Sequence, residues 1–201
     1  MMINIAVFAS GRGTNLQAII RAIKKGKLNV NLALVVSDVK SAYALKRAKR
    51  AGIKTVVIES KQFNSREDYD AEVVRVLEQE NIDLIVLAGF MRIITSVLIS
   101  RFPNKIINIH PALLPSFKGV HGIKDAFEYG AKVTGVTVHF VDEQMDHGPI
   151  ILQKAVKIEE DDTEETLEAK IHKAEHKLYP EAIRLCVEGR LKVENRRVRL
   201  V

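Results

Sequence analysis

Short apolar runs alternate with amphipathic stretches along the first half of the chain. The runs predict strands near residues 3–9, 30–37, 53–58, 83–88 and 105–109, and the amphipathic stretches predict helices near 15–26, 41–51, 66–80 and 95–101. Runs such as Leu-Ile-Val-Leu-Ala at 84–88 are typical of strands buried on both faces of a parallel sheet. The alternation therefore predicts an α/β fold with a Rossmann-like, mostly parallel sheet in the N-terminal half.

The second half has a different pattern. Polar and apolar residues alternate in 136–141 and 150–158, which predicts longer strands that extend the sheet. A long helix is expected over 163–187, with Pro180 kinking or dividing it and Gly189 ending it, followed by a short hairpin over 190–201. Because no repeat, low-complexity tract or linker separates these elements, we expect a single domain over residues 1–201.

The composition is that of a globular protein, with 47% apolar and 28% charged residues. There is no run of about 18 apolar residues, and residues 1–9 lack the basic segment that opens a signal peptide. We therefore expect a cytoplasmic protein with no membrane partner. Cys186 is the only cysteine, which excludes an internal disulfide and a thiolate metal cluster and agrees with a reducing compartment.

The formal net charge of +6 is distributed unevenly. Residues 1–60 hold eleven Lys or Arg against two acids, whereas residues 159–168 hold seven acids and no base. A basic N-terminal half fits an anionic small molecule, and it also fits RNA or an ordinary solvated face. Because aromatic residues make up only 5% and Trp is absent, stacking surfaces for RNA are not evident. We expect a small-molecule partner and no nucleic acid.

A glycine-containing loop, Ser10-Gly-Arg-Gly-Thr-Asn15, lies between the first predicted strand and the first predicted helix. Free N–H groups at a helix start, together with the helix dipole, form a binding site for phosphate. The loop matches neither dinucleotide nor ATP signatures, so a monophosphate is the favoured ligand. The alternative is a structural turn in which Thr14 or Asn15 caps the helix.

Asn108 and His110 lie two residues apart at the end of a predicted strand. A period of two points both side chains to one face, where an amide N–H and an imidazole can address the same developing oxyanion. The alternative is a strand end whose polar residues satisfy local backbone groups. His172 and His176 have the i, i+4 spacing of a helical metal pair, but the sequence places no third ligand, and we expect no metal site. His139 is expected to be a hydrogen-bonded core histidine.

Four stretches of the chain resemble those of the phosphoribosylglycinamide formyltransferase family: residues 10–17, 87–93, 108–115 and 145–150. The resemblance runs in order from Ile3 to about Leu191. It implies transfer of a formyl group from 10-formyltetrahydrofolate, as co-substrate, to the amine of glycinamide ribonucleotide in purine biosynthesis, without a metal. Residues 1–100 would then form the phosphate and nucleotide half, and residues 101–201 the catalytic and folate half.

The resemblance also implies roles for individual residues. The implied catalytic residues are Asn108, His110 and Asp146, with Asp146 holding His110 in its charged form. The implied contacts to the ribonucleotide are Gly13, Thr14, Asn15, His172 and Glu175. The implied contacts to the folate are Arg66, Met91, Arg92, Ile93, Ile94, Asn108, Val141, Asp142, Glu143, Gln144 and Met145. Leu114-Pro115 resembles a cis junction of the family.

Two departures from the family pattern affect loops: His147 follows Asp146 where many members have Gly or Thr, and residues 116–119 differ from a commoner Pro-Gly version. Two other functions stay open. One is hydrolysis of formyltetrahydrofolate or formyl transfer to another amine, such as charged tRNA, which we disfavour because those enzymes usually carry a further domain. The other is a non-catalytic phosphate-binding module. The sequence is compatible with a monomer or a homodimer.

Overall fold

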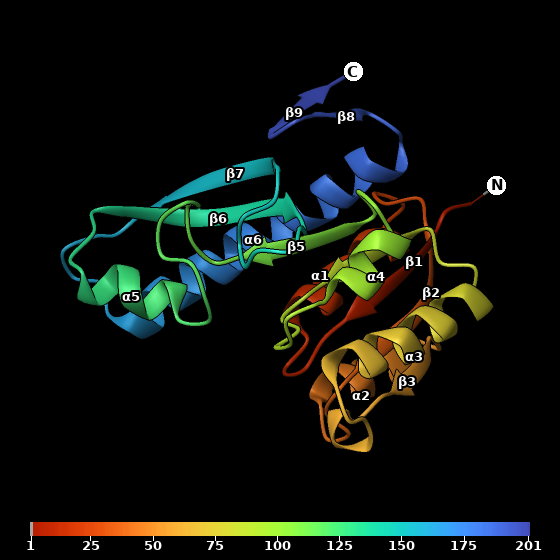
Figure 1. Cartoon of the computed structure of the whole chain (residues 1–201). Coiled ribbons are helices and arrows are strands. Elements are labelled where there is room, and N and C mark those ends of the chain that lie inside the picture. Colours follow the sequence, from red (N-terminus) through yellow and green to blue (C-terminus); the bar gives the residue numbers. More distant parts are fainter. Residues whose placement is uncertain (1) are drawn as a thin grey trace. The chain divides into compact units, whose positions relative to one another are not determined.

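The computed structural model describes residues 2–201 and has an α/β fold, as predicted. It divides into two compact units, a first unit that ends at Ile107 and a second unit of Asn108–Val201. Strand β5 (Ile106–His110) crosses this division, so Asn108 and His110 belong to the second unit. The predicted Rossmann-like parallel sheet, the strands added after it and the long C-terminal helix are all present (Figure 1).

Four parallel strands form the sheet of the first unit in the order β3-β2-β1-β4. Their bounds are Asn4–Phe8 for β1, Asn31–Ser37 for β2, Lys54–Val57 for β3 and Leu84–Leu87 for β4. The residues of strands β1 and β4 are almost entirely buried. Continuous apolar runs therefore became buried strands, as expected for a sheet covered on both faces.

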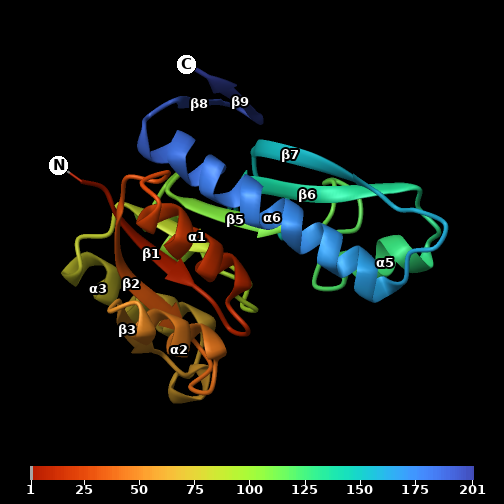
Figure 2. The same cartoon turned by 180° about the vertical axis from the view of Figure 1, so that it is seen from behind.

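Helices cover both faces of this sheet. Their bounds are Thr14–Lys24 for α1, Tyr43–Arg50 for α2, Arg66–Gln79 for α3 and Ser96–Arg101 for α4, and a 3-10 turn spans Ser60–Gln62. Helix α1 contacts α2, α3 contacts α4, and Figures 1 and 2 show α1 and α3 on opposite faces. The Ser65 hydroxyl accepts a hydrogen bond from the Asp68 N–H at 3.0 Å, so α3 begins with a side-chain cap.

The second unit orders its strands β5-β6-β7-β9-β8. The bounds are Val133–Phe140 for β6, Ile150–Lys157 for β7, Leu191–Glu194 for β8 and Arg197–Leu200 for β9. β6 and β7 are antiparallel, as are β8 and β9, which form the predicted hairpin. The unit also contains α5 (Gly122–Glu128) and α6 (Glu164–Val187).

Helix α6 lies along β6 and β7 (Figure 2). Thr163 and Thr166 form a reciprocal capping box at its start, and Gly189, with a φ of 67°, follows its last turn. Pro180 lies inside α6 without dividing it, although the ring removes one backbone N–H donor. No helix within residues 2–201 is both long and apolar enough to cross a membrane.

Two features of the second unit differ from the sequence-based prediction. The alternating pattern of β6 is typical of a half-exposed strand, but every residue from Thr134 to Phe140 is buried. The buried Thr137 of β6 is hydrogen-bonded: its hydroxyl donates to the Ala112 carbonyl at 2.7 Å and accepts from the Leu114 N–H at 3.0 Å. Helix α5 was not predicted, since it is short and begins without a side-chain cap. The Leu114-Pro115 peptide bond is cis, as the resemblance implies.

Candidate functional site

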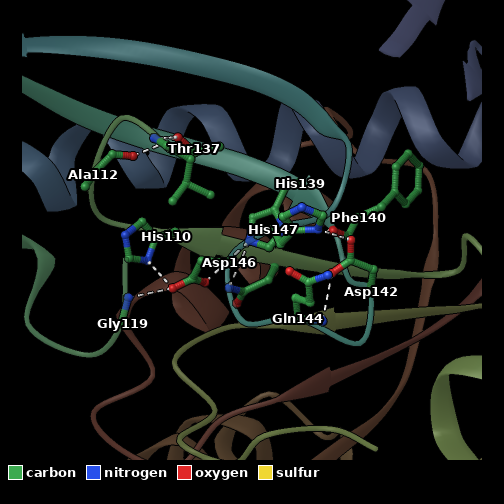
Figure 3. Close-up of polar contacts among 12 residues, drawn as sticks. His110, Ala112, Gly119, Thr137, His139, Phe140, Asp142, Gln144, Asp146 and His147 are labelled. Atoms are coloured by element: carbon green, nitrogen blue, oxygen red, sulfur yellow. Dashed lines mark hydrogen bonds and ion pairs between the residues drawn. The ribbon is translucent and has the colours of Figure 1, made fainter. Parts of the chain in front are cut away.

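Four polar side chains of the second unit form a buried cluster: Asn108, His110, His139 and Asp146. Asn108 and His110 come from β5. His139 comes from β6, and Asp146 from the loop between β6 and β7; Figure 3 shows His110, His139 and Asp146. His110 and His139 are each 2% exposed. The three residues implied as catalytic are thus brought together, and His139 joins them.

His110 has an acceptor opposite each ring nitrogen. Its Nε2 lies 2.7 Å from the Phe117 carbonyl oxygen, and its Nδ1 lies 3.4 Å from Asp146 Oδ2. Burial lowers the pKa of His110 below its usual value and outweighs the opposing effects of the Asp146 carboxylate and the Phe117 carbonyl. Asp146 raises the pKa of His110, as expected, but the sequence does not show the desolvation of the ring, which lowers the pKa by more.

The two acceptors give His110 a specific chemical property. A neutral imidazole carries one N–H and satisfies one acceptor, whereas the imidazolium satisfies both. The lowered pKa favours the neutral ring, and the two acceptors stabilise the charged ring once it forms. This combination suits a group that takes up and returns a proton during a reaction.

Asp146 stays ionised despite its burial. Burial raises its pKa, but the contact with His139, the hydrogen bond from the Gly119 N–H and the nearby His110 lower the pKa below its usual value. The Gly119 N–H donates to Oδ2 at 2.8 Å, and Oδ1 lies 3.7 Å from His139 Nε2. The carboxylate therefore has partners on both oxygens, and Figure 3 shows it between His110 and Gly119.

His139 orients Asn108. The Nδ1–H of His139 donates to the Phe140 carbonyl at 2.7 Å, which leaves Nε2 as an acceptor for the Asn108 Nδ2 at 3.3 Å. One amide N–H of Asn108 is thereby engaged, and the second N–H remains to donate elsewhere. The prediction of a hydrogen-bonded core histidine at 139 is correct, but its contacts with Asn108 and Asp146 were missed because 31 residues separate His139 from Asn108.

Replacing Asp146 with asparagine should lower the pKa of His110 further, because the carboxylate is the main group that raises it. The histidine Cε1–H resonances, followed by NMR as a function of pH, measure this shift: His110 should stay neutral to a lower pH in Asp146→Asn. Asp161→Asn is the matched control, since it removes an exposed carboxylate of the same unit that does not contact His110. An unchanged or raised His110 pKa in Asp146→Asn would contradict the contact between them.

The loop before α1 leaves the first turn of that helix uncapped. Gly13 is the N-cap residue, with a φ of 67° and no side-chain cap hydrogen bond, so neither Thr14 nor Asn15 is the N-cap residue. The first turn holds no acidic residue either. A Cβ at Gly13 would lie 2.7 Å from the Ala44 Cβ and 2.8 Å from the Ala44 Cα, so α2 packs directly against the glycine. This is the arrangement that an anion-binding loop needs.

Ser10, which we did not single out, connects this loop to residues 89–91. Its hydroxyl donates to Asp38 Oδ1 at 2.6 Å and accepts from the Met91 N–H at 3.0 Å. Met91 and Ile93 are 64% and 51% exposed, whereas Ile94 is buried. Two exposed apolar side chains on one loop are typical of a ligand wall. The Arg92 guanidinium stacks at 4.2 Å on the ring of the buried Tyr69.

The other implied folate contacts lie at loop and helix ends. Arg66 is the exposed first residue of α3 in the first unit. Residues 141–145 form the β6–β7 loop of the second unit, where the Asp142 carboxylate accepts from the Gln144 N–H at 3.0 Å and the Met145 side chain is 53% exposed. Val141 and Glu143 complete this loop.

Helix α6 carries the two implied ribonucleotide contacts of the second unit. His172 Nδ1 lies 2.9 Å from Glu175 Oε2, and its Nε2 lies 3.0 Å from Glu168 Oε1. The hydrogen bond to Glu175 raises the pKa of His172 despite its partial burial, and Glu168 adds to this effect. His176 stacks on His172 with ring centroids 6.2 Å apart. Glu175 itself is 4% exposed, which makes it a buried carboxylate beside a cationic ring.

The chain is similar to known formyl transferases over most of its length. The formyl transferase family model matches residues 3–183. The chain is 44% identical to the phosphoribosylglycinamide formyltransferase of Bacillus subtilis, over 91% of this chain and 94% of that protein. It is 47% identical to the trifunctional purine biosynthetic protein adenosine-3 of Gallus gallus, of which it spans 19%.

A solved structure supports the same relationship. Glycinamide ribonucleotide transformylase 1 from Symbiobacterium toebii superposes with a TM-score of 0.97 at 48% identity, covering 100% of this chain and 94% of that one. The family match, the relatives and the fold agree with the resemblance of the four sequence stretches. The chain therefore belongs to the formyl transferase family.

Proposed function

We propose that this chain transfers the formyl group of 10-formyltetrahydrofolate to the amine of N1-(5-phosphoribosyl)glycinamide, a step of de novo purine biosynthesis. The observation that carries the proposal is the buried cluster of Asn108, His110, His139 and Asp146, found in a chain of the formyl transferase family. The names of the most similar proteins support the choice of acceptor.

The folate donor supplies the formyl carbon that the ribonucleotide amine attacks, so the formyl oxygen gains negative charge. Asn108 donates its second amide N–H to this oxygen. His110 donates a stronger, charged hydrogen bond once it is protonated. A negatively charged oxygen is a better acceptor than the Phe117 carbonyl, which holds the His110 Nε2–H at 2.7 Å, so the developing charge draws that N–H toward itself.

Asp146 stabilises the charged form of His110 through the Nδ1 contact of 3.4 Å. Since its own pKa is lowered, Asp146 is ionised at neutral pH and accepts a proton only transiently. The amine loses a proton as the new C–N bond forms, and the folate nitrogen gains one as the old C–N bond breaks. His110 and Asp146 are the groups of this cluster that can carry that proton.

Each unit, taken by itself, carries candidate contacts to the substrates. In the first unit, the N–H groups at the start of α1, at Gly13, Thr14 and Asn15, would bind the ribonucleotide phosphate. In the second unit, Glu175, supported by His172, would accept from the donor groups of the ribonucleotide. In the first unit, the apolar side chains of Met91, Ile93 and Ile94 and the neighbouring Arg92 suit a flat aromatic ring system such as a pterin. In the second unit, the loop 141–145 is the candidate folate contact.

The direct test is an assay of the purified chain with 10-formyltetrahydrofolate in the presence and absence of glycinamide ribonucleotide. Formyl transfer predicts release of tetrahydrofolate only when the ribonucleotide is present. Release with water alone would indicate a hydrolase, and no release under either condition would indicate a non-catalytic binding module. A cytoplasmic location, no nucleic-acid partner, no metal, and a monomeric or homodimeric state remain predictions.

Replacing Arg66 with alanine should weaken folate binding by roughly tenfold and leave ribonucleotide binding nearly unchanged, because an arginine at this position is expected to pair with the glutamate carboxylates of the folate. Calorimetric titration of each ligand measures the two effects. Arg75→Ala on the same helix is the matched control, since Arg75 pairs only with Glu72 at the surface. Equal losses for both ligands would mean a general defect or a wrong assignment of Arg66.

A further inference from the structure

Arg196 and His147 connect the C-terminal hairpin to the loop that carries Asp146. Arg196 lies in the turn between β8 and β9, and its Nη2 donates to the His147 carbonyl at 2.7 Å. Its Nη1 lies 2.9 Å from His147 Nε2 and 3.1 Å from Nδ1. Nearly equal distances to both ring nitrogens place this guanidinium nitrogen over the face of the imidazole. The arginine therefore holds both the main chain and the ring of His147.

The contact continues from His147 into the loop. His147 Nδ1 lies 2.7 Å from Asp142 Oδ2, and because a carboxylate only accepts, Nδ1 carries the proton. The other oxygen of Asp142 accepts from the Gln144 N–H at 3.0 Å. Arg196, His147 and Asp142 thus form a chain of polar contacts that links the C-terminal hairpin to the two ends of the segment 142–147. Figure 3 shows His147 and Asp142 in this segment.

The backbone of this loop needs such support. Asp146 has a φ of 50°, in the left-handed region that residues with a side chain rarely adopt. A Cβ at Gly148 would lie 1.9 Å from the Phe140 carbonyl oxygen, so the two ends of the loop approach as closely as a glycine allows. Strained conformations persist when surrounding contacts determine them. Arg196 and Gly148 supply such contacts immediately after Asp146.

The hairpin itself is attached beside the loop. β9 pairs with β7 at a single position, where Arg197 lies opposite Ile150, the first residue of β7. The main-chain pairing at Ile150 and the contact of Arg196 with His147 therefore lie within a few residues of each other. Because this pairing anchors the turn that carries Arg196, the arginine side chain can restrain the loop it contacts.

We propose that Arg196 is a positioning residue: through His147 and Asp142 it holds the 141–147 loop, and with it the Asp146 carboxylate and the folate-facing side chains, in the geometry that binds the folate. This inference rests on the proposed function. Arg196 acts through His147 and is not itself a contact to the reacting atoms.

The test compares Arg196→Gln with Arg197→Gln. The control removes the same charge one residue away, from an exposed side chain with no hydrogen bond or ion pair to residues 2–201. Amide hydrogen exchange should be faster at residues 142–148 in Arg196→Gln than in the control. Tetrahydrofolate binding, measured by calorimetry, should weaken about tenfold, and ribonucleotide binding should change less than about twofold.

A double-mutant cycle adds a second arm. His147→Ala removes the ring contacts but keeps the Arg196 bond to the main-chain carbonyl, so it should reproduce part of the Arg196→Gln defect. The double variant should be no worse than the more affected single variant, because the ring contact is already lost in both. The positioning role is overturned if Arg196→Gln resembles Arg197→Gln, if loop exchange rises with unchanged folate binding, or if the two defects add. These readouts need no turnover, so failure of the formyl transfer assay in the unaltered protein is a separate result.

Discussion

Replacing His110 with alanine lowers kcat by at least about 10², while both substrates still bind, because the developing oxyanion loses its charged donor and the amine loses its proton acceptor. The acceptors at 2.7 Å and 3.4 Å stabilise the imidazolium, and alanine offers neither ring nitrogen. Steady-state kinetics with each substrate varied in turn measures the effect. Asn108→Ala should lower kcat to a similar degree.

Two comparisons separate a chemical effect from a folding defect. His121→Ala removes an exposed histidine from the same half of the chain and should leave kcat unchanged. His110→Gln keeps an N–H donor but cannot take up a proton, so its kcat should lie between those of the native and alanine proteins. Near-normal turnover in His110→Ala would exclude His110 from the chemistry, provided that thermal melting shows a folded variant.

Replacing Gly13 with alanine should weaken ribonucleotide binding by about 10- to 100-fold and leave folate binding nearly unchanged. The residue adopts a φ of 67°, and the new Cβ would meet the Ala44 backbone at 2.8 Å, so the loop and the start of α1 must shift. The N–H groups that face the phosphate would move with them. Isothermal titration with each ligand measures the difference.

Gly11→Ala is the matched control for this prediction, because a Cβ at Gly11 meets no atom within 4 Å and its backbone is not left-handed. It should bind the ribonucleotide almost as the native chain does. Removing the phosphate from the substrate should reproduce the Gly13→Ala defect in the native protein. If the dephosphorylated substrate is used equally well, the loop is a structural turn and another formyl acceptor becomes the better interpretation.

Local features of the chain were predictable from the sequence. Strand and helix periods are set by neighbours within a few residues, so the parallel strands and their helices were found to within a few positions. The C-terminal hairpin depends on equally local hydrogen bonds and turns. The spacing of Asn108 and His110 on one strand is likewise local, and it was enough to suggest an oxyanion-binding pair.

Features that depend on distant residues were decided by the tertiary structure. Burial of His110 lowers its pKa, which no sequence pattern records because desolvation depends on everything packed around the ring. His139 and Asn108 are 31 residues apart, and Arg196 and His147 are 49 apart, so their contacts exist only after folding. Gly13 is required by Ala44 of another helix. The sequence determined which elements form and which chemistry was available, and long-range packing decided the protonation and orientation of the groups that use it.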